Sequence, residues 1–345
     1  MYNLTVRVPA QENTYQIIIG QDAIAELKNI LNSLQSIDNT VVLYDENVNE
    51  YAKKVKEIAV SKEMIPVTPG EHSKTIEETK RISQVLLKTG MNRNSLLINV
   101  GGGMLTDLAG FVASIYMRGI RCIHVPTTLL GMVDAAIGGK TGVDLGDAKN
   151  MIGHYHHPSA VIEDIDFLET LPSKQLQEGI VEVIKVASML DNKFFSFLED
   201  NIEKILNRDA EELEQCIRRA VGLKVSVIEK DERDSSSRLF LNFGHTVGHA
   251  LEAASSFTIS HGEAVAIGMV AEMKITNSPE IERVQNLLEK TGVSTVIPKE
   301  FSTETLIKLM GNDKKNISTD IRMTVPRILG EGEIRDFDPS TLNVR

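Results

Sequence analysis

Short apolar runs alternate with stretches of helical periodicity along the first 165 residues of the chain. Most of the apolar runs are rich in β-branched residues and end at Gly, Asp or Pro, which is typical of strands. They occupy residues 4–8, 15–19, 40–44, 64–67, 95–100 and 121–125. Strands that alternate with helices form βαβ units, so the pattern predicts an α/β domain with a Rossmann-like, mostly parallel sheet.

The pattern changes after residue 165. Leu171-Pro172-Ser173 places a proline at the first turn of a helix, where its missing N–H removes no hydrogen bond. The helices that the periodicity then predicts span 174–190, 192–206, 209–229, 242–254, 262–277, 280–291 and 302–310. We therefore expect an α/β domain over 1–165 and an all-α domain over 166–345, with the active site in the cleft between them.

Polar and glycine-rich loops follow several predicted strands of the first domain. They contain Asp45, the segment 70–74, Gly101-Gly102-Gly103 and Thr127-Thr128. Ligands of parallel sheets bind at the carboxyl ends of the strands, and glycines let the backbone approach a phosphate at a helix N-terminus. The triplet lacks the GxGxxG spacing and by itself also fits a plain tight turn. Several such loops at one edge favour a dinucleotide site.

Composition narrows the classes of partner. The net charge is −11, from 37 Lys+Arg and 48 Asp+Glu, which argues against nonspecific binding to nucleic acid or an anionic membrane. Cys122 and Cys216 lack a metal-type spacing, so we expect free thiols in a reducing compartment. The chain has neither an apolar run of membrane-spanning length nor a signal-peptide core at its start. These features predict a cytoplasmic protein.

Residues 241–263 contain three of the eight histidines. His245 and His249 are four residues apart and share a helix face, and His261 follows in a loop before the next helix. Histidine is the commonest metal ligand, but this set still needs a carboxylate and lacks the HExxH spacing. Histidines held by hydrogen bonds explain the stretch equally well.

Glu182 lies in an otherwise apolar helical stretch, with Lys185 three residues later on the same face. We expect the pair to be partly buried, and a buried ion pair is one explanation for it. In the other, Glu182 supplies the missing carboxylate. Glu182, His245 and His261 would then leave a position open for substrate or water, as in catalytic zinc sites.

The segment 133–153 is rich in glycine and carries two lysines. Glycine exposes backbone N–H groups and lysine is a compact cation, so the segment is a candidate phosphate-binding loop. A flexible loop with solvated lysines is the alternative. Its polar residues include Asp134, Lys140, Lys149 and Asn150. Further along, Arg238 and Asn242 are four residues apart and lead into His245, so they can face the same pocket.

The order and spacing of these motifs resemble the 3-dehydroquinate synthases along nearly the whole chain. The matching motifs lie at 70–74, 101–107, 116–119, 125–130, 133–142, 149–150, 182–185, 231–233, 241–249, 261–263 and 313–315. Gly131-Met132 stands where the family often has Ser-Gln, and Ile180-Val181 replaces Leu-Ala. Neither departure removes a residue with a family role.

The resemblance implies a role for each matched residue. It implies Zn²⁺, with Co²⁺ as an alternative ion, at Glu182, His245 and His261. The implied NAD-binding residues are Asp45, Glu71, Lys74, Gly102, Gly103, Asp107, Thr127, Thr128, Lys140, Lys149, Thr170 and Leu171. The residues implied at the substrate's hydroxyls and carboxylate are Asp134, Lys140, Lys185, Lys224, Arg238 and Asn242. Those implied at its phosphate are Lys140, Asn150, Asn242, His249 and either Lys314 or Lys315, with Arg118 donated across a homodimer interface.

The family reaction converts 3-deoxy-D-arabino-heptulosonate 7-phosphate to 3-dehydroquinate and phosphate. It is the second step of the shikimate pathway, which leads to chorismate and the aromatic amino acids. The resemblance thus implies a lyase that uses NAD for transient oxidation, eliminates phosphate, reduces the product, opens the ring and closes it by an internal aldol step.

Three alternatives remain open from the sequence. One is another sugar phosphate cyclase, acting on sedoheptulose 7-phosphate or glucose 6-phosphate; His249 and the complete Gly-Gly-Lys-Thr-Gly segment favour the dehydroquinate branch. The second is an iron-type NAD-dependent polyol dehydrogenase with the same two-domain plan. The third, a noncatalytic metal- or nucleotide-binding protein, leaves the dense set of Lys, Arg and Asn residues unexplained.

Overall fold

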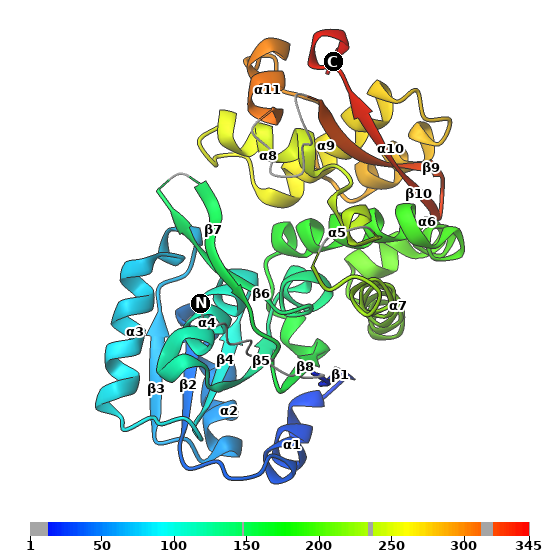
Figure 1. The fold of residues 1–345 in the computed structure, drawn as a ribbon. Helices are drawn as coiled ribbons and strands as arrows, with labels where there is room; N and C mark the ends of the chain where they lie inside the picture. The colour runs from blue at the N-terminus through cyan, green and yellow to red at the C-terminus, as the bar shows by residue number, and fades with distance from the viewer. Residues whose placement is uncertain (1–12, 147, 234–236, 312–319, 345) are drawn as a thin grey trace, which may run out of the picture.

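A parallel α/β part and a helical part follow one another along the chain in the computed structural model (Figure 1). The structure describes residues 13–146, 148–233, 237–311 and 320–344. The strand predicted at 4–8 and the residues Lys314 and Lys315 lie outside the described residues. The last strand of the parallel sheet ends at Asp164 and the next α-helix begins at Ser173. The domain boundary near residue 165 stays a prediction.

The described residues form a six-stranded parallel sheet in the order β1-β8-β5-β4-β2-β3. This confirms the predicted mostly parallel sheet, to which β8 is an addition. The strands are β1 (Gln16–Gly20), β2 (Thr40–Asp45), β3 (Glu63–Val67), β4 (Leu96–Gly101), β5 (Arg121–Pro126) and β8 (Ala160–Asp164).

Helices cover both faces of this sheet. On one face α3 (Ile76–Lys88) and α4 (Gly103–Ile115) pack on side chains such as Leu43. On the other face α1 (Leu27–Ser33) and α2 (Asn49–Ala59) pack on its neighbour Val42. Because successive strand residues point to opposite faces, coverage of both faces makes β2 and β4 nearly continuous apolar runs.

The helical part confirms the periodicity after residue 165. Its helices are α5 (Ser173–Leu190), α6 (Asn192–Leu206), α7 (Ala210–Ile228), α8 (His245–Ala254), α9 (His261–Ile275), α10 (Ile281–Lys290) and α11 (Thr303–Met310). Side chains of Asp191, Asp209 and Ser302 accept backbone N–H groups at the starts of α6, α7 and α11. These caps explain where the three helices begin.

Two antiparallel hairpins were not predicted. Strands β6 (Lys140–Leu145) and β7 (Ala148–Tyr155) pair with one another, so the glycine-rich segment is an ordered ribbon rather than a flexible loop. This hairpin extends from the α/β part toward α8 (Figure 1). The second hairpin, β9 (Ile321–Ile328) and β10 (Glu331–Phe337), adds a small sheet to the domain predicted as all-α.

Two predictions made from composition concern the cysteines and membrane-spanning helices. Cys122 and Cys216 are both buried free thiols, as predicted. Among the described residues, no helix combines the length and the apolar character that crossing a bilayer requires.

Candidate active site

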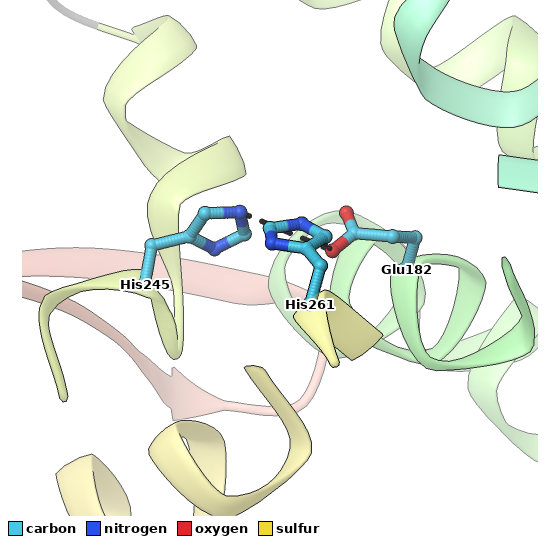
Figure 2. Close-up of side chains that lie close together, drawn as sticks. All are labelled: Glu182, His245 and His261. Atoms are coloured by element: carbon cyan, nitrogen blue, oxygen red, sulfur yellow. Dashed lines mark ion pairs between the residues drawn. The ribbon is translucent and has the colours of Figure 1, made fainter. Parts of the chain in front are cut away.

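Three helices bring Glu182, His245 and His261 together, and we call these residues the acid–histidine cluster. Glu182 lies in the middle of α5, while His245 and His261 are the first residues of α8 and α9. Their side chains point toward one another (Figure 2), and one ligand atom of each lies within 4.8 Å of the others. Nε2 of His245 and Nε2 of His261 are 3.9 and 3.5 Å from Glu182 Oε1.

Close packing of α8 against α9 sets the positions of the two histidines. Gly244, which precedes His245, has a left-handed backbone with φ 78°. A Cβ on Gly268 of α9 would lie 1.9 Å from the carbonyl oxygen of Gly244, so only glycine permits this approach. The backbone N–H of Gly244 also donates to buried Glu272 of α9 at 2.8 Å. The start of α8 is therefore held directly on α9.

The donor atoms of the cluster fit a divalent metal ion. Glu182 Oε1 is buried and accepts no hydrogen bond from the described residues. His245 Nδ1 lies 3.1 Å from the carbonyl oxygen of Phe243. Only a protonated nitrogen can donate to a carbonyl, so in the neutral ring the Nε2 turned toward Glu182 carries the lone pair. One carboxylate and two imidazoles form the set that catalytic zinc sites use, with a coordination position left for substrate.

Electrostatics at the cluster favour a cation. Burial lowers the pKa of the His261 imidazole, but Glu182 and Glu252 outweigh it and raise that pKa to about 10. Burial raises the pKa of Glu182, whereas Lys185 and His261 lower it to about 2. The two carboxylates thus stabilise a positive charge at this position, here the proton on His261.

Lys185 binds the other oxygen of Glu182. Both side chains are buried in α5, and Lys185 Nζ donates to Glu182 Oε2. The two explanations offered for this pair are therefore compatible. One oxygen of Glu182 forms the buried ion pair, and the other faces the two histidines.

Asp134 and Lys224 meet beside the cluster. Asp134 comes from η5 (Gly131–Ala135), and the buried Lys224 of α7 donates to its carboxylate and to its backbone carbonyl. Burial raises the pKa of Asp134, but the charges of Lys224 and Lys185 reverse this and lower it. Burial lowers the pKa of Lys224, and Lys185 adds to that effect. Two lysines and one aspartate thus share a small volume next to Glu182.

Arg238 and Asn242 are held by main-chain oxygens in this structure. Arg238 is buried; its guanidinium donates to the carbonyls of Glu232 and Gly138, the latter at 3.4 Å. Asn242 donates to the carbonyl of Leu239 at 3.2 Å. Arg238 therefore touches the turn that leads directly into Lys140.

Three of the residues predicted around a phosphate, Lys140, Asn150 and His249, lie on the hairpin and on α8. Lys140 is the exposed first residue of β6, and Asn150 is exposed on β7 with a positive φ of 53°. His249 is exposed on α8, and its ring meets that of His245 edge-on at 5.2 Å between centroids. The structure thus brings His249 to the cluster as a neighbour of His245.

The carboxyl ends of β2, β4 and β5 form what we call the glycine edge: Asp45, Gly101–Gly103 and Thr127-Thr128. A Cβ on Gly101 would lie 3.0 Å from Asp45 Cβ, and one on Gly102 would lie 3.0 Å from Thr128 Cγ2. Gly102 precedes α4 and provides no side-chain cap. Main-chain N–H groups at a helix start, beside glycines that have no Cβ to occupy the space, suit the phosphates of a nucleotide.

Charged residues beside the glycine edge pair with one another. Lys74 Nζ lies 2.6 Å from Asp107 Oδ2 and 3.6 Å from Glu71 Oε1. Thr170 Oγ1 is 2.9 Å from the hydroxyl of Tyr51, and the carbonyl of Leu171 accepts from Arg208. Asp107 lies in α4, and the other four predicted cofactor residues lie in loops or 3-10 turns outside the glycine edge.

Two predicted residues lie elsewhere. Lys149 contacts Glu252 of α8 at 2.8 Å, so in this structure its charge is directed to the helical part. Arg118 is exposed in the turn after α4, with φ 68°. A single chain does not test the prediction that a partner subunit donates Arg118.

Sequence reasoning missed Glu252 and Glu163. Glu252 is seven residues after His245 and thus on the same helix face, a signal that was available. Glu163 is fully buried in β8, and neither of its oxygens has a hydrogen-bond partner among the described residues. The sequence marks it only as an acidic residue that directly follows the apolar run Ala-Val-Ile.

Comparison with known proteins supports the resemblance read from the motifs. Residues 64–178 match the family described as 3-dehydroquinate synthase N-terminal, and residues 179–316 match 3-dehydroquinate synthase C-terminal. A 3-dehydroquinate synthase of Buchnera aphidicola subsp. Baizongia pistaciae is 39% identical over 338 residues, which cover 94% of each chain.

Two solved structures share the fold over almost the whole chain. One is 2-epi-5-epi-valiolone synthase from Streptomyces hygroscopicus subsp. jinggangensis with NAD⁺ and Zn²⁺ bound; it is 25% identical, with a TM-score of 0.87 over 96% of this chain and 95% of that one. The other is 2-deoxy-scyllo-inosose synthase complexed with carbaglucose-6-phosphate, NAD⁺ and Co²⁺, which is 26% identical, with a TM-score of 0.82 over 94% of both chains. With adjoining N- and C-terminal matches and a relative of nearly equal length, this chain belongs to the 3-dehydroquinate synthase family.

Proposed function

We propose that this chain is a carbon–oxygen lyase that converts 3-deoxy-D-arabino-heptulosonate 7-phosphate to 3-dehydroquinate and phosphate. The observation that carries the proposal is the acid–histidine cluster, found in a chain of this family at the residues that its motifs single out. The lysines beside the cluster suit an anionic substrate, despite the net charge of −11.

The two cofactors have separate places in this proposal. Glu182, His245 and His261 hold Zn²⁺ or Co²⁺, and the glycine edge holds NAD⁺, as expected from structural relatives with these groups bound. When bound, the metal ion would supply Lewis acidity to the substrate's adjacent hydroxyls, and NAD⁺ would supply reversible hydride transfer.

The chain's own residues bind the substrate and manage its charge. Lys224 and Lys185 neutralise the charge of the substrate's carboxylate, and Asp134 accepts a hydrogen bond from a hydroxyl on the substrate's ring. The hydrogen bond from Lys224 to Asp134 supports these roles, because it holds the two side chains together. Lys140, Asn150 and His249 surround the phosphate that leaves. Oriented cations of this kind stabilise developing negative charge without reorganising during the reaction.

A single assay tests the function. Purified protein is mixed with Zn²⁺, NAD⁺ and the heptulosonate phosphate, and phosphate and 3-dehydroquinate are measured over time. We expect the two products in equal amounts with no net NADH. A polyol dehydrogenase would instead form NADH from glycerol, and another cyclase would release phosphate from sedoheptulose 7-phosphate or glucose 6-phosphate. Absence of phosphate release by folded, metal-loaded protein would overturn the proposal.

We also propose a homodimer in which Arg118 completes the partner's site. Ile115 and Met117, next to Arg118, are large apolar side chains that are 47% and 43% exposed. Arg118→Ala and Glu182→Gln should each be inactive alone. After the two variants are mixed and allowed to exchange subunits, activity should return, because a hybrid dimer contains one intact site. Mixed protein that stays inactive although native mass spectrometry shows hybrid dimers would contradict the proposal.

A further inference from the structure

Glu252 lies on the face of α8 that carries two histidines of the site. His245, His249 and Glu252 are spaced by four and three residues, which places them on one side of a helix. Glu252 is 2% exposed, so its carboxylate must find partners inside the protein. A single oxygen of Glu252, Oε1, lies close to the side chains of His261 and Lys149.

The first of these side chains is His261. Its Nδ1 lies 3.4 Å from Glu252 Oε1, while its Nε2 lies 3.5 Å from Glu182 Oε1. The ring is therefore placed between two carboxylates, one at each nitrogen. A carboxylate behind a ligating histidine fixes the ring's orientation and tautomer and makes the other nitrogen a stronger ligand. The Nδ1 of His245, in contrast, lies 3.1 Å from the neutral carbonyl oxygen of Phe243.

The second side chain is Lys149, which comes from the other part of the molecule. Its Nζ lies 2.8 Å from Glu252 Oε1 and 4.7 Å from the centroid of the Phe257 ring. Lys149 lies on β7, in the hairpin that extends toward α8 (Figure 1). The same oxygen that supports His261 therefore also holds the hairpin that carries Lys140 and Asn150.

We propose that Glu252 is a positioning residue that orients His261 toward the metal ion. Through its contact with Lys149, Glu252 also couples the position of the β6–β7 hairpin to the orientation of His261. This inference rests on the proposed metal site. It adds a link between that site and the hairpin proposed to bind phosphate. Because a bound ion would hold His261 and hence Glu252 in place, metal binding and docking of the hairpin should strengthen one another.

The test is the Zn²⁺ affinity of full-length, metal-free protein, measured by competition with a chromogenic zinc chelator. Glu252→Gln keeps the shape of the side chain and removes its charge. We expect its Kd for Zn²⁺ to rise about 10- to 100-fold, the range seen when a partner behind a ligating histidine is lost. Lys149→Met is the matched control, because it removes the other contact and leaves His261 its carboxylate. Its Kd should rise only slightly, by the part of the affinity that docking of the hairpin contributes, and far less than the Kd of Glu252→Gln.

Two further readouts separate positioning from general stability. The visible spectrum of the Co²⁺-loaded protein should shift in Glu252→Gln and stay unchanged in Lys149→Met. Zn²⁺ should slow amide hydrogen exchange in Ala148–Tyr155 of the wild type and not of Lys149→Met. A purely structural role for Glu252 would lower the Tm of the metal-free protein and leave the Kd and the spectrum unchanged.

The outcomes distinguish this inference from the proposed function. If the wild type binds no Zn²⁺, the metal site fails and the inference fails with it. If the wild type binds Zn²⁺ and Glu252→Gln binds it equally well, only the inference is overturned. If Lys149→Met weakens binding as much as Glu252→Gln, the effect comes from docking of the hairpin, and the assignment of Glu252 to His261 is wrong.

Discussion

The glycine edge and the acid–histidine cluster are built in opposite ways. The edge presents main-chain groups within one βα turn and depends on missing side-chain atoms, since a Cβ on Gly102 would meet Thr128 at 3.0 Å. The cluster takes one side chain from each of three helices, with ligand atoms within 4.8 Å of one another. The edge should therefore be sensitive to added atoms, and the cluster to lost ones.

The largest effect is expected where a ligand atom is lost from the cluster. In Glu182→Gln, an amide oxygen replaces the buried carboxylate oxygen, so we expect Zn²⁺ affinity to fall by at least about 100-fold, with activity lost in parallel. Metal content after dialysis and phosphate release measure the two effects. Circular dichroism checks that the fold survives the loss of the partner of Lys185. Unchanged zinc occupancy would remove Glu182 from the ligand set.

A smaller effect is expected from an exposed charge that belongs to neither region. Lys140→Ala removes the cation at the start of β6, and we expect the KM for the phosphorylated substrate to rise about 10-fold or more, as loss of a charged hydrogen bond implies. Zinc content should not change, since Lys140 is outside the cluster. Steady-state kinetics measure the effect. An unchanged KM together with an unchanged rate would contradict the assignment.

An added methyl group should weaken the glycine edge. Gly102→Ala overpacks the turn against Thr128, at a cost of roughly 1–3 kcal/mol, so the Kd for NAD⁺ should rise about 10-fold. Zn²⁺ affinity should stay unchanged, which is the reverse of the pattern for Glu182→Gln. Calorimetric titration measures both.

A second substitution at the same contact sharpens that prediction. Thr128→Ser removes Cγ2, the atom that meets the new methyl group, and keeps the hydroxyl that accepts the N–H of Gly131 at 3.0 Å. The double variant should recover part of the lost affinity. If it binds NAD⁺ no better than Gly102→Ala, the contact with Thr128 is not the cause.

The smallest effect concerns stability alone, at the buried Glu163. Burial raises the pKa of Glu163 well above its usual value, although the charge of Lys224 opposes this. Because the folded-state pKa is the higher one, the contribution of Glu163 to stability is fully present below the unfolded pKa of about 4.3 and is lost as pH rises through the raised value.

Glu163→Gln removes this pH dependence. Relative to the wild type, its free energy of unfolding should increase with pH by up to about 1.4 kcal/mol per pH unit between the two pKa values. Urea denaturation at several pH values measures the difference, and Zn²⁺ and NAD⁺ affinities serve as controls. A difference that does not change with pH would show that Glu163 titrates normally.

Local patterns were enough for most of the scaffold. Strands β2, β4 and β5 are apolar runs that end at Gly, Asp or Pro, and α5 to α7 follow from helical spacing. Such patterns depend on neighbours within a few residues, which any sequence displays. The hairpin β6–β7 was missed because a glycine interrupts each strand and no residue of β7 is fully buried, so no apolar alternation marks it.

The residues of the candidate site also divide into those that the local sequence indicates and those that only the fold brings together. Glu182 stands out as an acid in an apolar helix, and the histidines stand out by their number. The partners of these residues were not visible: Lys149 and Glu252 are 103 residues apart. Nothing in either local sequence distinguishes this pair from other lysines and glutamates.

By itself the sequence determined the order of most strands and helices, the turns that need glycine, and the candidate residues for binding a metal or a nucleotide. Only the tertiary structure decided that Lys185 takes one oxygen of Glu182 and leaves the other facing His245 and His261. It also decided that Glu252 lies behind His261. The physical reason is that helix and strand propensity act between near neighbours, whereas these contacts require α5, α8 and α9 to pack together at defined angles.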